Sequence, residues 1–306
     1  MKILLPIDGS FYSKNAVQSL AKCASSLCDK STIILVNVVA PVLEEVNAEL
    51  TDYNLMGTRF TKVLLHQFYD AESYELFEKA RDLLHNVHCK VEEITLVGNP
   101  AERIAEVADK MDVALIVMGS HGRSALRTMI FGSVTEGVIS RTKKPILLVR
   151  GQPITCKEAP KVGIAIGDCE DACEYNPAIA NFIKSHRQFF NKDANFYLIH
   201  VFKPKHHGHA HKCSCNCERN EEKLEDFNKI VDPIVPLLNE AGIIPKEVCL
   251  QGNPAKEIEK YVADKHIDLL IMGSHGHRRF DMKLLGSTTL KVAETVDVPL
   301  LIIHNI

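Results

Sequence analysis

The feature that most constrains this 306-residue chain is one glycine spacing that occurs twice. A constant shift of 154 positions carries the glycines and the following serine of the first copy onto those of the second. The two copies are Gly119-x2-Gly122-x9-Gly132-Ser133 and Gly273-x2-Gly276-x9-Gly286-Ser287. The same shift superimposes the Gly-Asn-Pro-Ala segments that begin at Gly98 and Gly252. An internal duplication explains this agreement, so we expect two copies of one domain.

Each glycine pattern follows an apolar run and precedes a predicted helix. Residues 114–118 and 269–272 are apolar on both faces, which is typical of strands buried inside a parallel sheet. The helices that begin at Ser133 and Ser287 favour an anion through their unpaired backbone N–H groups and dipole. Glycine permits close approach to phosphate oxygens or a positive φ. A plainer alternative is that these glycines only end strands and helices, but the duplication and the paired serines favour a phosphate site.

The composition excludes several classes of protein. The net charge is −3, so the chain has no strongly basic field of the kind that drives binding to nucleic acid. No window reaches the ~18 apolar residues of a membrane span, and the apolar stretch at the N-terminus is too short for a signal peptide. The 10 cysteines do not resemble a secreted disulfide scaffold and favour metal or redox chemistry. We therefore expect a cytoplasmic protein that binds neither nucleic acid nor a membrane.

Predicted strands and helices alternate along both halves of the chain. In the first half we expect strands at residues 2–7, 32–39, 90–97, 114–119 and 146–149, and helices at 13–27, 64–86, 100–110 and 133–141. In the second half we expect strands at 161–166, 195–202, 247–250 and 269–273, and helices at 177–190 and 221–241. This alternation predicts an α/β fold of two tandem, doubly wound parallel sheets. Domain 1 would span residues 1–150, a linker 151–160, and domain 2 residues 161–306.

These residues together resemble the universal stress protein family, in its tandem form, over essentially the whole chain. The G-x2-G-x9-G-S/T pattern is that family's ATP-binding signature, and the run from Gly132 to Glu136 is similar to its ATP-binding members. Pro6-Ile7-Asp8 matches the family segment whose aspartate contacts adenosine, and Val38 matches a position that packs on the base. The resemblance implies the Rossmann-like fold of the adenine nucleotide alpha hydrolases. It also implies a pseudo-dimer of the two domains, paired through residues 146–149 and 300–303, and a homodimer is a further candidate.

By this resemblance domain 1 has a complete site for ATP, with Mg²⁺ as a candidate accompanying ion. The implied phosphate contacts are Gly119, Gly122, Gly132, Ser133, Val134 and Thr135. The implied nucleoside contacts are Pro6, Ile7, Asp8, Val38 and Met118.

Domain 2 departs from this pattern at the nucleoside side. Aligning residues 161–166 with residues 2–7 places Gly167 opposite Asp8, and the nearest carboxylate, Asp168, is shifted by one position. A shift of one residue at the end of a strand redirects the side chain. The phosphate part persists as Gly273, Gly276, Gly286, Ser287 and Thr288. We therefore expect a degenerate nucleotide site in domain 2.

Domain 2 also carries a segment, residues 203–217, that has no counterpart in domain 1. Its candidate metal ligands are His206, His207, His209, His211, Cys213, Cys215 and Cys217, and Cys169 and Cys173 of the segment after the first strand lie near enough in the expected topology to join them. Imidazole and thiolate are the ligands that zinc prefers, and thiolates also suit copper(I). The alternate-residue spacing is not that of a zinc finger. The alternative is a polar loop that binds metal only opportunistically.

The motifs favour binding over catalysis. His121 and His275 lie in the glycine loops, but each is explained as simply by a local hydrogen bond after a tight turn. The chain has no G-x4-G-K-S/T loop, so no lysine is placed on the phosphates as fast phosphoryl transfer requires. We expect an ATP-binding stress-response module that regulates an unidentified protein partner. The alternatives are a slow ATPase and a zinc buffer or sensor that uses the histidine and cysteine segment.

Overall fold

The computed structural model describes residues 1–23, 31–39, 73–120, 131–151, 154, 157–167, 175–202, 221–274 and 285–304. The chain divides into two compact units, Met1–Thr155 and Cys156–Ile306, which we call domain 1 and domain 2. The predicted pairing of the two domains stays a prediction. No helix among the described residues is long and apolar enough to cross a membrane.

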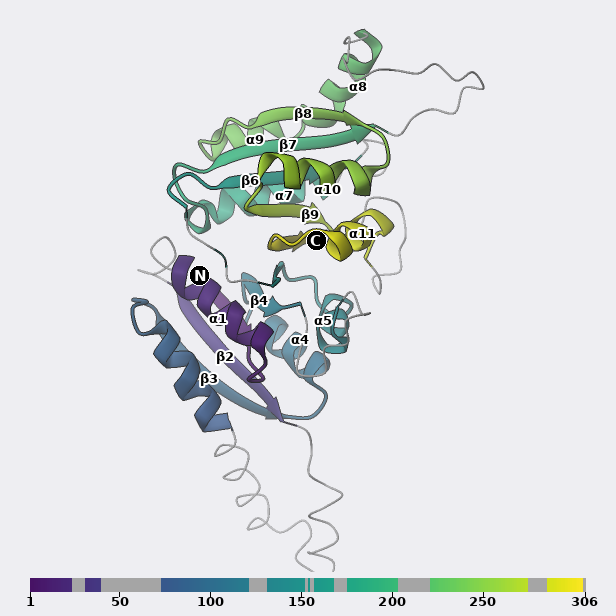
Figure 1. The fold of residues 1–306 in the computed structure, drawn as a ribbon. Helices are drawn as coiled ribbons and strands as arrows, with labels where there is room; N and C mark the ends of the chain where they lie inside the picture. Colours follow the sequence, from purple (N-terminus) through teal and green to yellow (C-terminus); the bar gives the residue numbers. More distant parts are fainter. Residues whose placement is uncertain are drawn as a thin grey trace, which may run out of the picture. The chain divides into compact units, whose positions relative to one another are not determined.

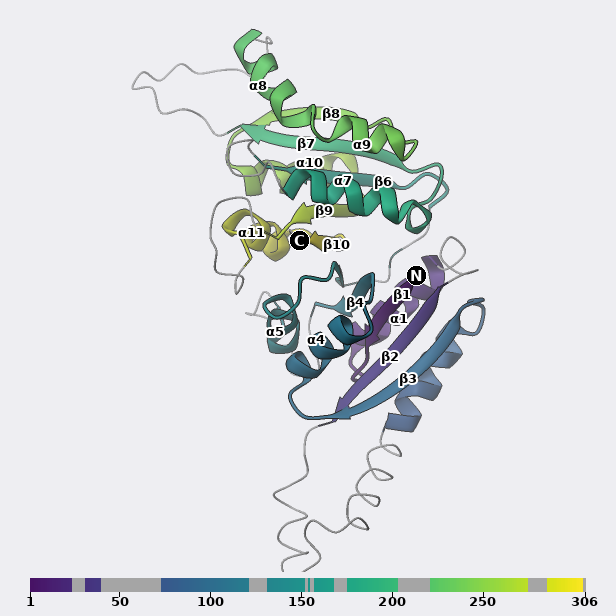
Figure 2. The same ribbon diagram turned by 180° about the vertical axis from the view of Figure 1, so that it is seen from behind.

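Domain 1 is a parallel sheet with helices on both faces (Figure 1). Its strands are β1 (Lys2–Pro6), β2 (Thr32–Val39), β3 (Lys90–Val97), β4 (Leu115–Gly119) and β5 (Ile146–Val149), in the order β3-β2-β1-β4-β5. The helices are α1 (Phe11–Cys23), a helix over residues 73–84, α4 (Pro100–Lys110) and α5 (Ser133–Ile139). Figures 1 and 2 show α1 on one face of the sheet and α4 and α5 on the other.

Domain 2 repeats this arrangement. Its strands are β6 (Lys161–Ile166), β7 (Asn195–Phe202), β8 (Lys246–Gln251), β9 (Leu269–Gly273) and β10 (Leu300–Ile303), in the order β10-β9-β6-β7-β8. The helices are α7 (Tyr175–Ser185), α8 (Glu221–Val231), α9 (Val235–Glu240), α10 (Pro254–Lys265) and α11 (Ser287–Thr295). The paired strands are parallel within each domain. The prediction of two doubly wound parallel sheets is therefore confirmed.

The central strands form the core because helices cover both of their faces. All of β4 is buried, which explains why this segment is apolar at every position rather than at alternate ones. The edge strand β3 is only partly buried and carries Glu92 and Glu93. Charged side chains on an edge strand oppose pairing with other chains.

Two predicted helices are interrupted. The helix expected at 221–241 ends at Val231 and resumes at Val235. Pro233 lies in the break, has no N–H to donate, and disfavours helical backbone at the residue before it. The helix expected at 177–190 ends at Ser185, and a short 3-10 turn follows over Arg187–Phe189. His186 between them has φ −123° and ψ 35°, outside the helical range.

Candidate nucleotide site

The sheet of domain 1 changes winding direction between β1 and β4. These strands are neighbours, with Ile3 opposite Leu115 and Leu4 opposite Ile116, while β2 and β5 lie outside them on either side. At such a switch point the loops leave in opposite directions and open a crevice beyond the carboxyl ends of the strands. Asp8 follows β1 and Ser120 follows β4. The topology therefore brings Asp8, a predicted nucleoside contact, and the end of β4, where the predicted phosphate contacts begin, to the same edge of the sheet.

A tight turn after β1 orients Asp8. Gly9 has a φ of 76°, a conformation that strains most other residues. Oδ1 of Asp8 accepts a hydrogen bond from the backbone N–H of Ser10 over 2.9 Å. Ser10 Oγ in turn accepts from the N–H of Ser13 over 3.1 Å, so Ser10 caps the first turn of α1. Asp8 is half-buried and lies between the end of β1 and the start of α1.

Gly119 ends β4 directly beneath α1. A Cβ atom at this position would lie 2.6 Å from the backbone carbonyl carbon of Tyr12. Glycine is therefore required for the packing of α1 against β4, whether or not a phosphate is bound. The sequence pattern indicates only that some group approaches Gly119 closely. The structure shows that this group is the backbone of Tyr12.

The loop after β4 is closed at its base by backbone hydrogen bonds. The N–H of Gly132 donates to the carbonyl of Ser120 over 2.9 Å, and the N–H of Ser120 donates to Val149 over 3.1 Å. Gly132 has φ −65° and ψ 151°, which any residue can adopt. A positive φ is therefore excluded as the reason for glycine at Gly132, and close approach of a ligand stays a prediction.

The side chains in the first turn of α5 differ in burial. Thr135 is buried, and its Oγ1 donates to the carbonyl of Gly119 over 3.1 Å. Ser133 is exposed and Val134 is half-buried at the start of the helix. Thr135 thus fastens α5 to the end of β4, and Ser133 is the hydroxyl that is accessible to a ligand.

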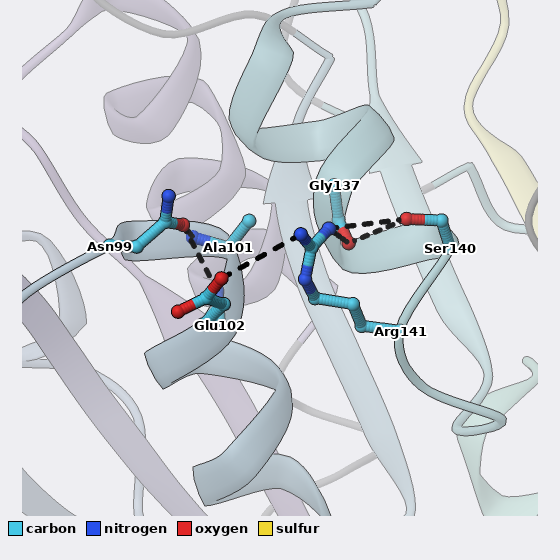
Figure 3. A network of polar contacts seen from close by, with 6 residues as sticks. All are labelled: Asn99, Ala101, Glu102, Gly137, Ser140 and Arg141. Carbon is cyan, nitrogen blue, oxygen red and sulfur yellow. Dashed lines mark hydrogen bonds and ion pairs between the residues drawn. The ribbon is translucent and has the colours of Figure 1, made fainter.

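The far end of α5 is braced against α4 (Figure 3). A Cβ at Gly137 would lie 2.5 Å from the Cβ of Ala101, so the two helices approach too closely for any other residue. Arg141 Nη1 donates to the carbonyl of Gly137 over 3.0 Å, and Nη2 lies 3.8 Å from Oε1 of Glu102. That ion pair is exposed and contributes little. The close packing at Gly137 fixes the direction in which α5 presents its N-terminus.

The remaining predicted contacts of domain 1 lie on the neighbouring strands. Ile7 and Met118 are buried, and Pro6 and Val38 are half-buried. Val38 lies on β2, paired with Leu96 of β3. Gly122, like Gly276 of domain 2, lies outside the described residues.

Domain 2 keeps the closed loop of domain 1. The N–H of Gly286 donates to Ser274 over 2.7 Å, and the N–H of Ser274 donates to Ile303 over 2.8 Å. Thr289 Oγ1 donates to the carbonyl of Gly273 over 2.9 Å, which repeats the bond of Thr135. The predicted contact in domain 2 is Thr288, whereas the shift of 154 positions leads from Thr135 to Thr289. The half-buried Thr288 corresponds to Val134, and Ser287 is exposed like Ser133.

The end of β6 differs from the end of β1. Gly167 stands where domain 1 has Asp8, and its N–H donates to Asn176 Oδ1 over 3.3 Å. Asn176 Nδ2 donates back to the carbonyl of Gly167 over 3.2 Å. A buried amide on α7 thus occupies both backbone groups of Gly167. The turn is held by a neutral side chain, and glycine stands where domain 1 has the acidic Asp8.

The candidate metal ligands all fall outside the described residues: His206, His207, His209, His211, Cys213, Cys215, Cys217, Cys169 and Cys173. Among the residues that the structure describes, no three His, Cys, Asp or Glu side chains are grouped so as to hold a metal ion.

Comparison with known proteins identifies the family. The sequence pattern of the universal stress protein family matches residues 1–150 and 189–304. Universal stress protein MJ0577 of Methanocaldococcus jannaschii is 31% identical over 158 residues, which cover 49% of this chain and 94% of that protein. Universal stress protein YxiE of Bacillus subtilis is 30% identical over 149 residues, which cover 49% of this chain and 98% of that protein.

A solved structure shares the fold over both domains. A universal stress protein from Archaeoglobus fulgidus DSM 4304 superimposes with a TM-score of 0.67, covering 99% of this chain and 96% of that chain at 17% identity. The stretch that the family pattern leaves unmatched, residues 151–188, contains β6 and the turn at Gly167. The duplicated glycine motif, the repeated sheet and the family match over both halves agree, and this chain belongs to the universal stress protein family.

Proposed function

We propose that domain 1 binds ATP in the crevice between the carboxyl ends of β1 and β4. The observation that supports the proposal is that Asp8 and Ser120, which accepts the N–H of Gly132, follow the adjacent strands β1 and β4 at the switch point. This is where doubly wound sheets hold nucleotides. Asp8 would contact the adenosine, and the exposed start of α5 with Ser133 would face the phosphates, with Mg²⁺ as a candidate counter-ion.

We propose further that ATP acts as a signal and is not rapidly consumed. The sequence supplies no lysine of the G-x4-G-K-S/T type to stabilise a transferring phosphoryl group. A ligand that binds one conformation more tightly than another shifts the population toward it. Bound ATP would thereby select the conformation of domain 1 that a protein partner in the cytoplasm recognises. Slow hydrolysis would serve to end the signal.

The two domains would differ in affinity. Domain 2 retains the closed loop at Ser274 and Gly286 but has Gly167 and Asn176 where domain 1 has Asp8. A phosphate group alone offers much less binding energy than a phosphate with a nucleoside. Domain 2 would therefore bind ATP weakly, which predicts one tight site per chain.

Isothermal titration calorimetry of the purified, tag-free chain tests this proposal. We expect one tight ATP site per chain, with ADP release close to the background rate. Two equal tight sites would contradict the division of labour between the domains. Steady turnover would favour an ATPase, and absence of ATP binding would overturn the proposed function.

A second function is proposed for the segment at residues 203–217 on sequence alone. Its density of imidazole and thiol groups supports zinc binding, and the segment follows β7 of the domain whose nucleoside contact is changed. Domain 2 would then have exchanged nucleotide binding for a metal site.

Replacing Cys213, Cys215 and Cys217 together by serine should remove tightly held zinc and leave ATP affinity unchanged, because the proposed ATP site uses other residues. Serine is a poor zinc ligand because its hydroxyl stays protonated at neutral pH. Elemental analysis after dialysis, on the unaltered chain and the triple variant side by side, measures the difference. Equal metal contents in both would show that these cysteines hold no metal.

A further inference from the structure

Two buried polar side chains lie behind the end of β1 in domain 1. Asn37 on β2 is 5% exposed, and Ser73, in the helix over residues 73–84, is fully buried. Asn37 Nδ2 donates to the carbonyl of Ile7 over 2.8 Å, and Asn37 Oδ1 accepts from Ser73 Oγ over 2.9 Å. Polar groups inside a core are costly unless they are paired, and these bonds compensate for their burial. A short polar chain thus runs through apolar surroundings to the residue before Asp8.

This chain completes the attachment of Ile7 to β2. The N–H of Ile7 donates to the carbonyl of Val36 over 2.8 Å, as in a parallel strand that continues past Pro6. The Asn37 amide then takes the carbonyl of Ile7. Both backbone polar groups of Ile7 are therefore held by β2. Since Asp8 is the next residue, the position of its backbone relative to β2 depends on these two bonds.

Asn37 also precedes Val38, the second proposed nucleoside contact, along β2. Val38, the next residue along β2, is the predicted contact for the adenine base. Asn37 therefore stands between Asp8, which it reaches through Ile7, and Val38, which it reaches through the backbone. The proposed phosphate contacts belong to different elements, the end of β4 and the start of α5.

We propose that Asn37, held by Ser73, is a positioning residue that sets the spacing between Asp8 and Val38 and so fixes the recognition of the nucleoside. The inference rests on the proposed ATP site of domain 1. It predicts that loss of Asn37 weakens binding of the nucleoside part of ATP and spares the binding of the phosphates.

Domain 2 suggests a substitution at position 37 that keeps the hydrogen bond made by Asn37. Lys2 pairs with Thr32 in domain 1 and Lys161 pairs with Asn195 in domain 2, so the registers of the strands place Asn37 and His200 at equivalent positions. His200 is buried, and its Nδ1 lies 3.1 Å from the carbonyl of Ile166. Nδ1 carries the proton of this bond because a carbonyl oxygen can only accept. A histidine at position 37 can therefore restore the bond to Ile7.

The test compares Asn37→Ala, Asn37→His and Ser73→Ala by calorimetry with ATP and with inorganic tripolyphosphate, alongside denaturant unfolding of each variant. For Asn37→Ala we expect an ATP affinity lower by about three- to tenfold, the effect of one to two net hydrogen bonds, and an unchanged tripolyphosphate affinity. Asn37→His should recover most of the ATP affinity, and Ser73→Ala should fall between the unaltered chain and Asn37→Ala.

Each other outcome overturns the inference. Parallel loss of ATP and tripolyphosphate affinity would mean that Asn37 only stabilises the fold. Unchanged ATP affinity in Asn37→Ala, or failure of Asn37→His to recover it, would show that the bond to Ile7 does not position the site. Absence of ATP binding by the unaltered chain would overturn the proposed function itself, which keeps the two failures distinct.

Discussion

Replacing Asp8 by alanine is expected to remove most of the ATP binding of the chain, with a loss of about tenfold or more in affinity. A hydrogen bond to a charged group contributes about 1.5–3 kcal/mol, and Asp8 is the proposed acidic contact of domain 1, where domain 2 has Gly167. The same measurement on Gly286→Ala should show little change, because domain 2 is proposed to bind ATP weakly. Equal losses from the two substitutions would contradict the asymmetry between the domains.

Asp8→Asn is the matched control for this prediction. Oδ1 of Asp8 already accepts the N–H of Ser10, so alanine removes a turn contact together with the carboxylate. Asparagine keeps one acceptor oxygen for that turn and replaces the second oxygen by an amide donor. If the carboxylate contacts the ligand, Asp8→Asn should bind ATP about as weakly as Asp8→Ala. Normal binding by Asp8→Asn would assign the loss to the turn.

Replacing Gly132 by alanine is expected to weaken ATP binding by about 1–3 kcal/mol without unfolding the chain. The φ of −65° at Gly132 suits alanine, so the substitution adds no backbone strain in the free protein. The added methyl group would instead crowd a phosphate seated at the start of α5, at a cost like that of overpacking a core. Calorimetry and denaturant unfolding of the same preparation measure both quantities.

Gly119→Ala is the control in which the added methyl group crowds the protein itself and not a ligand. Its Cβ would lie 2.6 Å from the backbone of Tyr12, so domain 1 should lose about 1–3 kcal/mol of stability even without ligand. Together the two glycine variants separate crowding of a ligand from crowding of the protein. Unchanged ATP affinity in Gly132→Ala would mean that the start of α5 does not hold phosphate.

Local sequence signals predicted those parts of the fold whose causes are local. The helix Pro100–Lys110 was predicted at its observed bounds because Asn99 caps it, with Oδ1 accepting from the N–H of Ala101 over 3.0 Å, and Pro100 suits the first helical position. The breaks at Pro233 and His186 were missed, the first because apolar periodicity continues across the proline.

The parts of the site that depend on tertiary contacts could not be predicted from the pattern. Gly119 and Tyr12 are far apart along the chain, so the packing reason for this glycine appears only when α1 lies on β4. The Asn37–Ser73 pair is equally invisible, since each residue alone is an ordinary polar position. For Gly132 the motif left open a close approach or a positive φ, and the structure excludes only the positive φ.

The backbone bonds at the two glycine motifs have a consequence for how the two domains could diverge in sequence. Ser120 and Gly132 in domain 1, like Ser274 and Gly286 in domain 2, join through backbone atoms, so the bond is indifferent to the side chains between them. After Gly-Ser-His-Gly the two loop sequences differ almost throughout, as Arg-Ser-Ala-Leu-Arg-Thr against His-Arg-Arg-Phe-Asp-Met. After a gene duplication, the sequence between these two backbone positions could therefore change in one copy while the bond that joins them was kept.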